Sequence, residues 1–281
     1  EGVSFVYLTS TMLDAMLERP GIEAAAGTLR HVWCGGEVLT PDLFARFRSR
    51  LPDSTMYHGY GPAEATIGVS CEVYRGEDRR TGVTIGRPNP NVRMYILAPG
   101  LRPVPPGVPG EIHIGGVQVA QGYLGDPYRT ADRFVPDPYG GEPGARLYAT
   151  GDLGRYRHDG VIEFLGRVDR QVKIRGYRIE LEEVEAVLCR HPAVRQAVVL
   201  VREDTPGAQH LAAYCLAVPG RPAPGEESLR AWAAERLPEY AVPHSAQVLP
   251  EFPLMPSGKA DRAALAALPA AAPVAAPYVR P

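Results

Sequence analysis

Glycine and proline are unusually frequent in this chain, with 30 glycines and 29 prolines among 281 residues. Both interrupt regular structure, because proline fixes φ and lacks an N–H, while glycine adopts turn conformations at little cost. A chain interrupted this often must be built from many short helices and strands joined by turns. Its length favours one large domain or two smaller ones.

The composition excludes several classes of protein. Hydrophobic residues make up 45% and charged residues 22% of the chain, as is typical of globular proteins. The net charge of -2 gives no electrostatic case for binding nucleic acid or an acidic membrane. No apolar run approaches the roughly 20 residues that span a bilayer, and no signal-peptide pattern is present. We therefore expect a cytoplasmic protein with neither a nucleic-acid nor a membrane partner.

The four cysteines are scattered along the chain at positions 34, 71, 189 and 215. No CxxC pair occurs, so the spacing indicates neither a zinc site nor a disulfide framework. We expect buried, reduced thiols.

The first sixty residues alternate between short apolar segments and helical periodicity. Residues 3–8 and 29–37 are typical of strands, and Thr40 before Pro41 is typical of a helix N-cap with proline at the first helical position. Residues 54–68 indicate a strand that breaks into a glycine-rich turn, with a helix starting after Pro62. Strand, helix, strand, helix predicts a layered α/β sheet. Met12, Leu13, Met16 and Leu17 follow the first strand at helical spacing, and the buried face expected of the helix after Thr40 is Leu43, Phe44, Phe47 and Leu51.

The middle of the chain changes character. Residues 93–116 hold short β runs separated by turn residues, which predicts a small β subdomain. Residues 148–180 are again rich in β-forming residues. The first part of the chain is therefore expected to be a layered α/β domain that carries a small β subdomain.

The second half predicts a compact α+β domain. Residues 179–191 indicate a helix, residues 194–201 and 210–218 a pair of strands, residues 226–237 an amphipathic helix and residues 247–249 a short strand. The first helix is expected to bury Ile179, Val184, Val187 and Leu188. The predicted domains are residues 1–167 and 168–268. Residues 269–281, almost entirely Ala, Pro and Val, are expected to form a linker that leads to another domain.

The stretch "HGYGPAEAT" at residues 58–66 has residue types that suit a nucleotide. Gly59 and Gly61 let the backbone approach a ligand, and Tyr60 offers a ring to a flat base. Glu64 lies where a helix is expected to begin, and a carboxylate there can hold Mg²⁺ beside phosphates. Taken alone, the stretch is equally consistent with a strand-to-helix turn.

Two further stretches carry weaker signals. In "YATGDL", Gly151 permits a tight turn and Asp152 offers acceptor oxygens to a ribose diol, although Gly-Asp is common in turns. In "GRVDRQVKIRGYRIELEEVE", five basic residues lie within twelve positions. A charged strand followed by a helix with an acidic first turn accounts for most of that stretch. It accounts poorly for Gly176, which suggests close approach by a backbone or a ligand.

Several common catalytic patterns are absent from the sequence. Neither a Walker-type phosphate loop nor a GxGxxG run occurs. The histidines and cysteines show no nucleophilic arrangement. A mechanism based on those motifs is therefore not indicated.

Each stretch alone is a weak signal, but the order in which the stretches follow one another along the chain is specific. The series "GYGPAEAT", "GEIHIGGVQVAQGYL", "YATGDLGRYRHDGVIEFLGRVDRQVKIRGYRIELEEVE", "LPEYAVP" and "PSGKADR" resembles the adenylate-forming superfamily. Within it, the chain resembles the amino-acid adenylation domains of nonribosomal peptide synthetases, up to Arg262. The resemblance also implies that the family's Ser/Thr/Gly-rich phosphate loop and the aspartate for the substrate amino group lie upstream of Glu1, so an N-terminally truncated domain is expected.

The resemblance implies site residues at matching positions of this sequence. Tyr60 would stack on adenine, Glu64 would help to hold Mg²⁺, and Asp152 would bind the ribose hydroxyls. The full nucleotide set it implies is His58, Gly59, Tyr60, Gly61, Ala63, Glu64, Asp152, Phe164 and Arg167. The implied substrate pocket is Tyr7, Trp33, Gly35, Gly59, Ile67 and Gly68, none of them charged, which favours a neutral amino-acid side chain.

Three more implied roles belong to the domain boundary and the second domain. Asp169 would be the hinge, Gly176 would face the tunnel for phosphopantetheine, and Lys259 would lie between the substrate carboxylate and the α-phosphate. Two positions depart from the family's pattern. His58 stands where asparagine is typical. Ala63 stands where a threonine gives a hydroxyl to phosphate, and losing that bond costs roughly 0.5–1.5 kcal/mol.

The activity implied by the resemblance has two steps. ATP and Mg²⁺ activate an amino acid as an aminoacyl-adenylate, and the thiol of a carrier domain's phosphopantetheine then takes the aminoacyl group. Two alternatives stay open: a ligase of the same superfamily that uses coenzyme A, and an inactive fragment that serves as a binding module. Without the phosphate loop, the 281 residues alone are expected to be inactive.

Overall fold

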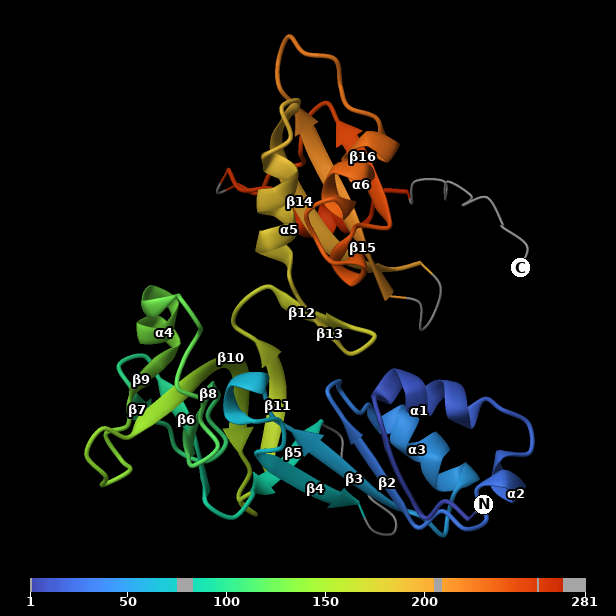
Figure 1. Cartoon of the computed structure of the whole chain (residues 1–281), viewed down its shortest axis with the longest axis vertical. Helices are drawn as coiled ribbons and strands as arrows, with labels where there is room; N and C mark the ends of the chain where they lie inside the picture. The colour runs from blue at the N-terminus through green and yellow to red at the C-terminus, as the bar shows by residue number, and fades with distance from the viewer. Residues whose placement is uncertain (1, 75–82, 205–208, 257, 270–281) are drawn as a thin grey trace. The chain divides into compact units, whose positions relative to one another are not determined.

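The computed structural model describes residues 2–74, 83–204, 209–256 and 258–269. The chain divides into two compact units, Glu1–Asp169 and Arg170–Pro281 (Figure 1). This boundary lies two residues after the one expected from the sequence, at 167/168. The expected linker after Pro269 lies outside the described residues, as does Ser257 beside Lys259.

The first unit begins with a layered α/β arrangement. Strands β1 (Phe5–Leu8), β2 (His31–Gly35) and β3 (Thr55–Tyr60) pair in parallel in that order. Helices α1 (Ser10–Leu17) and α3 (Pro41–Arg50) cover one face of them (Figure 1). The predicted strand-helix-strand-helix order is confirmed. Buried residues of both layers form one core: Leu8, Leu13, Leu17, Leu29, Val32, Cys34, Leu39, Leu43, Phe44, Phe47, Leu51, Met56 and Tyr74.

Local sequence determines where these helices start. The hydroxyl of Thr40 accepts a hydrogen bond from the backbone N–H of Leu43, and Pro41 occupies the first helical position, as predicted. Thr9 caps α1 in the same way, through the backbone N–H of Met12. The short helix α2 (Ile22–Ala25) follows α1 after a left-handed glycine, Gly21.

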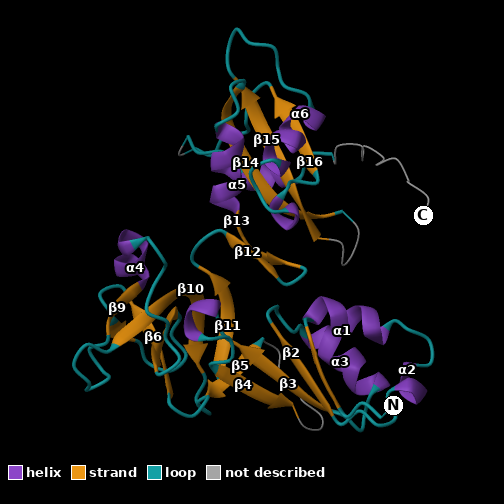
Figure 2. Ribbon diagram, viewed as in Figure 1, coloured by secondary structure: helices purple, strands orange, loops and turns teal. Residues whose placement is uncertain are grey.

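The sheet continues with antiparallel strands toward the end of the unit. Its order is β1-β2-β3-β4-β5-β11-β10-β8-β6-β7, with β9 paired to β10 (Figure 2). The strands beyond β3 are β4 (Ser70–Tyr74), β5 (Thr84–Pro88), β6 (Val92–Ala98), β7 (Arg102–Pro103), β8 (Gly110–Gly116), β9 (Phe134–Pro136), β10 (Arg146–Tyr156) and β11 (Ile162–Arg167). The expected β subdomain is present.

Two helical segments of this region differ from what the sequence indicated. The helix expected after Pro62 is a single 3₁₀ turn, η1 (Ala63–Ala65), because the chain enters the left-handed region at Thr66 and Ile67. Helix α4 (Pro127–Arg133) was not predicted, although Asp126 caps it through the N–H of Arg129 and proline fills its first position.

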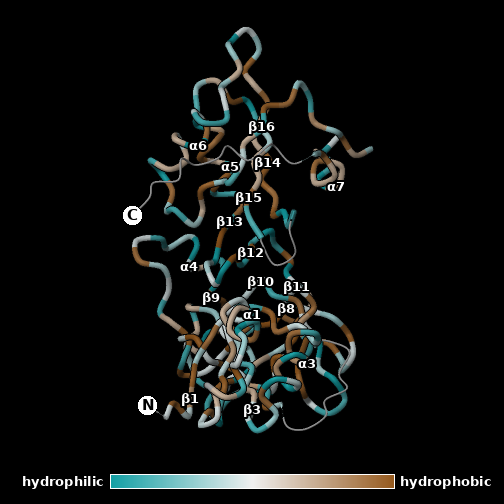
Figure 3. The backbone as a smooth tube through the Cα atoms, turned by 90° about the vertical axis from the view of Figure 1, so that its right-hand side faces the viewer, coloured by the Kyte–Doolittle hydropathy of each residue, from teal (hydrophilic) through white to brown (hydrophobic). Residues whose placement is uncertain are grey.

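The second unit is the predicted α+β domain. Hairpin strands β12 (Gln171–Ile174) and β13 (Tyr177–Glu180) precede α5 (Leu181–Cys189). Strands β14 (Val194–Glu203) and β15 (Gln209–Ala217) are antiparallel. The remaining elements are α6 (Glu226–Ala234), η2 (Glu239–Ala241), β16 (Ser245–Leu249), parallel to β15, and α7 (Arg262–Ala266). Hydrophobic residues, brown in Figure 3, run along β14 and β15, which lie within this unit's core.

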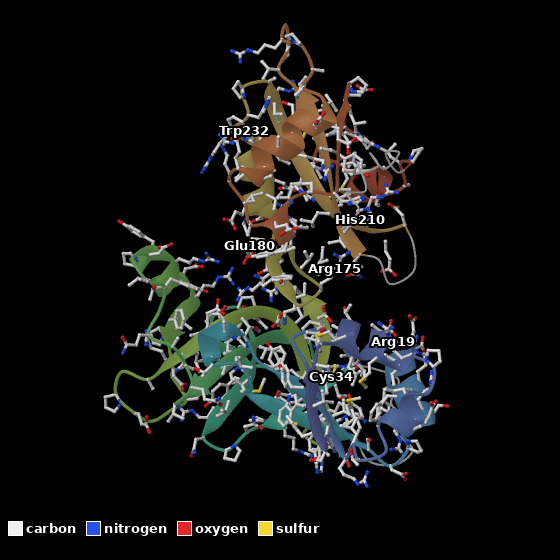
Figure 4. All side chains as sticks on the ribbon, turned by 45° about the vertical axis from the view of Figure 1, so that its right-hand side comes forward. Arg19, Cys34, Arg175, Glu180, His210 and Trp232 are labelled. Atoms are coloured by element: carbon white, nitrogen blue, oxygen red, sulfur yellow. The ribbon has the colours of Figure 1, made fainter. Side chains whose placement is uncertain are left out.

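One residue predicted to be helical and two cysteines predicted to be buried differ from the prediction. Ile179 is buried, but it belongs to β13, because α5 begins only at Leu181. The cysteines are free thiols, as expected, and Cys34 (Figure 4) and Cys215 are buried. Cys71, however, is only partly buried, and Cys189, the last residue of α5, is exposed. Among the described helices, none has the length and apolar character needed to cross a bilayer.

Candidate functional site

Three of the predicted nucleotide residues meet in the first unit. The hydroxyl of Tyr60, at the end of β3, donates to Oδ2 of Asp152 at 2.5 Å. Arg167, at the end of β11, donates through Nη1 to Oδ1 of the same carboxylate at 2.6 Å. Asp152 and Arg167 come from consecutive, paired strands, whereas Tyr60 precedes Asp152 by 92 residues and is brought to it by the order of strands in the sheet. Phe164 lies beside Tyr60, with ring centroids 6.5 Å apart.

The cluster is buried, and its protonation follows from that. Tyr60 is 9% exposed and Asp152 is 6% exposed. Burial, followed by the negative charge of Asp152, holds the pKa of Tyr60 well above its usual range. The phenol therefore remains a hydrogen-bond donor at neutral pH, and the carboxylate has a donor on each oxygen.

A bulge in β10 aims the Asp152 carboxylate. The pairing with β8 shifts register between Ala149 and Leu153, and Gly151 has φ +73° within that shift. The Thr150 hydroxyl donates to the carbonyl of Ile112 at 2.7 Å and accepts from the N–H of Asp152 at 2.9 Å. Thr150 thereby fixes the backbone of the residue that carries the carboxylate.

Asp169 is tied to the same cluster. Its two carboxylate oxygens accept from Nε and Nη2 of Arg167 at 2.6 and 2.7 Å. A Cβ on Gly151 would lie 2.6 Å from Oδ2 of Asp169, so glycine is needed there for space as well as for φ. Asp169, the predicted hinge residue, thus binds Arg167, and Arg167 also binds Asp152, the predicted ribose residue.

Glu64 lies in a separate polar contact of the first unit. It is 9% exposed, and its Oε1 accepts from the hydroxyl of Tyr123 at 2.7 Å. Burial raises the pKa of Tyr123, so this phenol also stays protonated. Because η1 is one 3₁₀ turn, the helix-dipole argument for an anion site at Glu64 does not apply. The described residues contain no group of three or more metal-ligating side chains.

Four of the six predicted substrate residues lie on the parallel strands: Tyr7 on β1, Trp33 and Gly35 on β2, and Gly59 on β3. Gly35 pairs with Gly59, and Tyr7 pairs with Trp33. The missing side chains leave room for large neighbours: a Cβ on Gly59 would lie 2.4 Å from the indole Nε1 of Trp33, and one on Gly35 would lie 2.9 Å from the hydroxyl of Tyr7. Two aromatic residues with polar tips therefore cover two glycines. Ile67, 65% exposed, lies beyond them on the turn after η1.

Other predicted residues have local structural roles. His58 is 3% exposed, and its Nδ1 lies 2.8 Å from the carbonyl of Thr84 and its Nε2 3.4 Å from that of Glu37. A Cβ on Gly61 would overlap the carbonyl of Ile67, at 1.2 Å. Ala63 is exposed, and Gly68 has open space around it.

In the second unit, Gly176 is explained by its turn. Arg175 (Figure 4) and Gly176 form the two-residue loop between β12 and β13, with φ of +51° and +80°. A type I′ hairpin turn needs positive φ at both positions, which favours glycine. The glycine alone therefore does not indicate a ligand, contrary to the sequence argument.

Lys259 lies on the surface of the second unit. Its carbonyl accepts from the N–H of Met255 at 2.8 Å, and Leu254 bridges to Ala260, so it ends a closed turn. Gly258 has φ +80° within that turn. The side chain of Lys259 is exposed.

Sequence reasoning missed residues that support the cluster. Thr150 and Tyr123 lie inside stretches that were singled out, but neither was assigned a role. Glu111 accepts from the N–H of Gly151 at 2.8 Å. Only the pairing of β8 with β10 brings it there, which no local pattern could have shown.

Family models match both units. Residues 1–124 match the AMP-binding enzyme family, and residues 183–259 match the AMP-binding enzyme C-terminal domain. The chain is 48% identical over 266 residues to the phosphinothricin tripeptide synthetase PhsB of Streptomyces viridochromogenes, covering 94% of this chain and 22% of that protein. It is 43% identical over 283 residues to a dimodular nonribosomal peptide synthase of Bacillus subtilis, covering 95% of this chain and 11% of that one.

Solved structures agree with these relatives. The holo form of PA1221, a nonribosomal peptide synthetase protein with adenylation and PCP domains, matches with TM-score 0.82 and 31% identity, over 94% of this chain and 44% of that one. The amide bond synthetase McbA from Marinactinospora thermotolerans matches with TM-score 0.77 and 25% identity, over 94% and 51%. The chain thus spans about half of these structures and under a quarter of the synthetases named above.

Proposed function

This chain belongs to the AMP-binding enzyme family, and from that premise we propose that it forms part of an amino-acid adenylation domain. In the proposed reaction, the carboxylate of an amino acid attacks the α-phosphorus of ATP and pyrophosphate leaves. The aminoacyl group then passes from the adenylate to the phosphopantetheine thiol of a carrier domain, and AMP is released. The synthetase relatives and the PCP-containing structure support this choice.

The Tyr60–Asp152–Arg167 cluster is the observation that carries the proposal. A carboxylate with a fixed backbone and a donor on each oxygen is preorganised to accept hydrogen bonds from a ribose diol. Tyr60 and Phe164 offer aromatic surface for the base next to it. We assign Tyr60 to adenine and Asp152 to ribose. Arg167 holds Asp152, and we assign it to the ribose or phosphate region of the nucleotide.

Magnesium fits the residues present in one limited way. Mg²⁺ is usually held by one or two carboxylates together with phosphate oxygens and water, and Glu64 supplies one such carboxylate in a nearly buried position. When bound, the ion neutralises charge on the nucleotide's phosphates. Tyr123 keeps the Glu64 side chain in place through its hydroxyl.

The substrate side of the proposal rests on Gly35 and Gly59. These glycines leave space beneath the aromatic rings of Tyr7 and Trp33, and these four residues carry no charge. A charged side chain would lose hydration there without gaining a partner among them. We therefore propose an amino acid with a neutral side chain.

Catalysis in the first step consists of positioning and charge neutralisation, because one anion must approach another. Lys259 is assigned to the developing charge between the substrate carboxylate and the α-phosphate. We further propose that the second unit moves about Asp169 between the two steps, and that the Gly176 turn faces the carrier's thiol arm in the second.

Separate assays of the two steps test these assignments in the full-length protein. Lys259→Ala should abolish adenylate formation, measured by ATP–pyrophosphate exchange, and largely spare thioester formation from supplied adenylate. Gly176→Trp should do the reverse. Equal loss of both steps in both variants would point to misfolding and contradict the assignments.

ATP–pyrophosphate exchange by the 281 residues alone should stay near background. Robust exchange would show that the chain needs no further phosphate-binding segment.

A further inference from the structure

Glu185, on α5, holds an unusual number of partners for one carboxylate. Its side chain is 13% exposed and accepts from Nη1 and Nη2 of Arg170 at 2.9 and 3.0 Å. It also accepts from Nη2 of Arg262 at 2.7 Å and from the backbone N–H of Val199 at 2.9 Å. A largely buried carboxylate is tolerated only when it is paired and hydrogen-bonded, and here every donor is strong.

The contact with Val199 closes the edge of a sheet. β14 is the outer strand of the β14-β15-β16 sheet, so alternate backbone groups of β14 face away from β15. At Val199 the outward N–H donates to Glu185, and the outward carbonyl accepts from Nη1 of Arg262 at 2.9 Å. One ion pair thus satisfies both edge groups of a single residue. This joins α5, β14 and the start of α7.

Arg262, the first residue of α7, follows directly on the segment that carries Lys259. The N–H of Asp261 donates to the carbonyl of Pro253 at 2.7 Å, and Asp261 caps α7. Lys259 therefore lies three positions before Arg262, whose guanidinium is bound by the carbonyl of Val199 and by Glu185. Leu265 of α7, fully buried, anchors the other end of this segment.

From these contacts we infer that Glu185 is a positioning residue for Lys259. The carboxylate fixes Arg262, Arg262 fixes the base of the turn, and the turn presents the ammonium group. The inference rests on the proposed function for its catalytic consequence. A displacement of about 1 Å at a catalytic group costs on the order of 100-fold in rate, so a loosened turn should be visible in the first step of the reaction.

The first test uses the 281-residue chain and needs no activity. Glu185→Gln keeps the size of the side chain and one acceptor for Val199 but removes the charge that holds Arg262. Hydrogen exchange of a peptide spanning residues 253–261 should become about tenfold faster, since the amides of Met255, Gly258 and Asp261 donate to carbonyls of the same segment. Peptides from β15 should be unchanged.

Glu182→Gln is the matched control. Glu182 lies one turn earlier on the same helix and binds Arg170 at 2.9 Å, whereas its contacts within the described part of the chain do not include Arg262. Its substitution should leave exchange at residues 253–261 unchanged within about twofold. If Glu185→Gln leaves that peptide unchanged, or if the control changes it equally, the link to the turn is wrong.

The second test measures the reaction in the full-length protein. Glu185→Gln should lower kcat for adenylate formation about 10- to 100-fold, with a smaller change in KM for ATP, and spare thioester formation from supplied adenylate. Arg262→Ala should match it, and the double variant should be no worse than either single variant. Unchanged kcat, or additive losses, would overturn the inference. A wild-type protein without exchange activity would refute the proposed function instead, and the hydrogen-exchange test would still decide the link to the turn.

Discussion

Gly61 has no space for a side chain. A Cβ there would lie 1.2 Å from the carbonyl oxygen of Ile67 and 2.9 Å from the backbone nitrogen of Val69, so the backbone itself would have to shift. We expect Gly61→Ala to lower the free energy of unfolding by at least about 3 kcal/mol. Gly68→Ala is the control, because a Cβ there meets no described atom within 4 Å.

The Gly68 variant should stay within about 0.5 kcal/mol of the parent chain. Urea denaturation measures both. Unfolding of the first unit is followed by the fluorescence of Trp33 in a Trp232→Phe background, since the chain has two tryptophans and each unit holds one. Equal stability of the two glycine variants would contradict the close approach of Gly61 to the 67–69 segment.

The thiols should differ in reactivity with pH. Burial raises the pKa of Cys34 to about 11 and that of Cys215 to about 12. Burial also raises the pKa of Cys189, but this thiol is exposed to reagents whereas Cys34 and Cys215 are buried. At pH 8 about one in a thousand Cys34 thiols is ionised. A thiol reagent should therefore modify Cys189 first. Rapid labelling of Cys34 in the folded chain, mapped by mass spectrometry, would contradict this order.

The sign of the linked stability change follows from the same shift. The folded state holds the Cys34 proton more tightly than the unfolded state does. The contribution is therefore fully present below pH 9 and is lost as the pH rises toward 11. Cys34→Ser should flatten that part of the pH profile of the free energy of unfolding, at the cost of a lower stability at neutral pH.

At the scale of elements, the cap of α3 gives a measurable contribution. The hydroxyl of Thr40 satisfies the N–H of Leu43, which otherwise has no intrahelical partner. Thr40→Ala should lower the stability of the first unit by about 1 kcal/mol, and Thr40→Ser, which keeps the hydroxyl, by much less. The same Trp33 fluorescence reports both. Identical losses for Ala and Ser would show that the methyl group, rather than the cap, matters at this position.

Thr40 also shows which elements the sequence predicts well. Caps, helical periodicity and paired strands are local signals, so α3, α5, α6 and the β14–β15 pair were expected, to within a few residues. η1 was expected to be longer, because the left-handed turn at Thr66 has no glycine to announce it. The extent of a short helix depends on the tertiary contacts that end it, such as the bond from Thr66 to the carbonyl of Gln118.

In the candidate site, too, local sequence indicated the residues but not the contacts between them. Tyr60 and Asp152 were expected from their motifs and the family resemblance, but neither motif indicates that the two side chains bond to each other. That contact depends on β10 and β3 lying in one sheet, and on the bulge at Gly151. Likewise, the contacts of Glu185 with Val199 and Arg262 span 14 and 77 residues of sequence. Contacts of this range are fixed by topology, which one sequence does not specify.

At the scale of the whole chain, each unit has its own core. The buried clusters of the second unit draw only on residues from Ile174 onward, and those of the first unit only on residues up to Ile162. The ion pairs of Glu185 likewise lie entirely within the second unit. A domain needs its own hydrophobic core to fold alone, and the second unit meets that condition.

Residues 170–281 expressed alone should therefore fold cooperatively. Trp232 is the internal reporter: its indole N–H donates to the carbonyl of Val187 at 2.9 Å, and the guanidinium of Arg236 lies 3.5 Å from its ring centroid. Loss of both contacts on unfolding should change its fluorescence.

The urea midpoint of the isolated unit should match the midpoint of the same transition in the full chain, followed in a Trp33→Phe background. The two free energies of unfolding should differ by less than about 1 kcal/mol. A broad transition without cooperativity in the isolated unit would mean that its core depends on the first unit, and the division at Asp169 would not be one between independently stable domains.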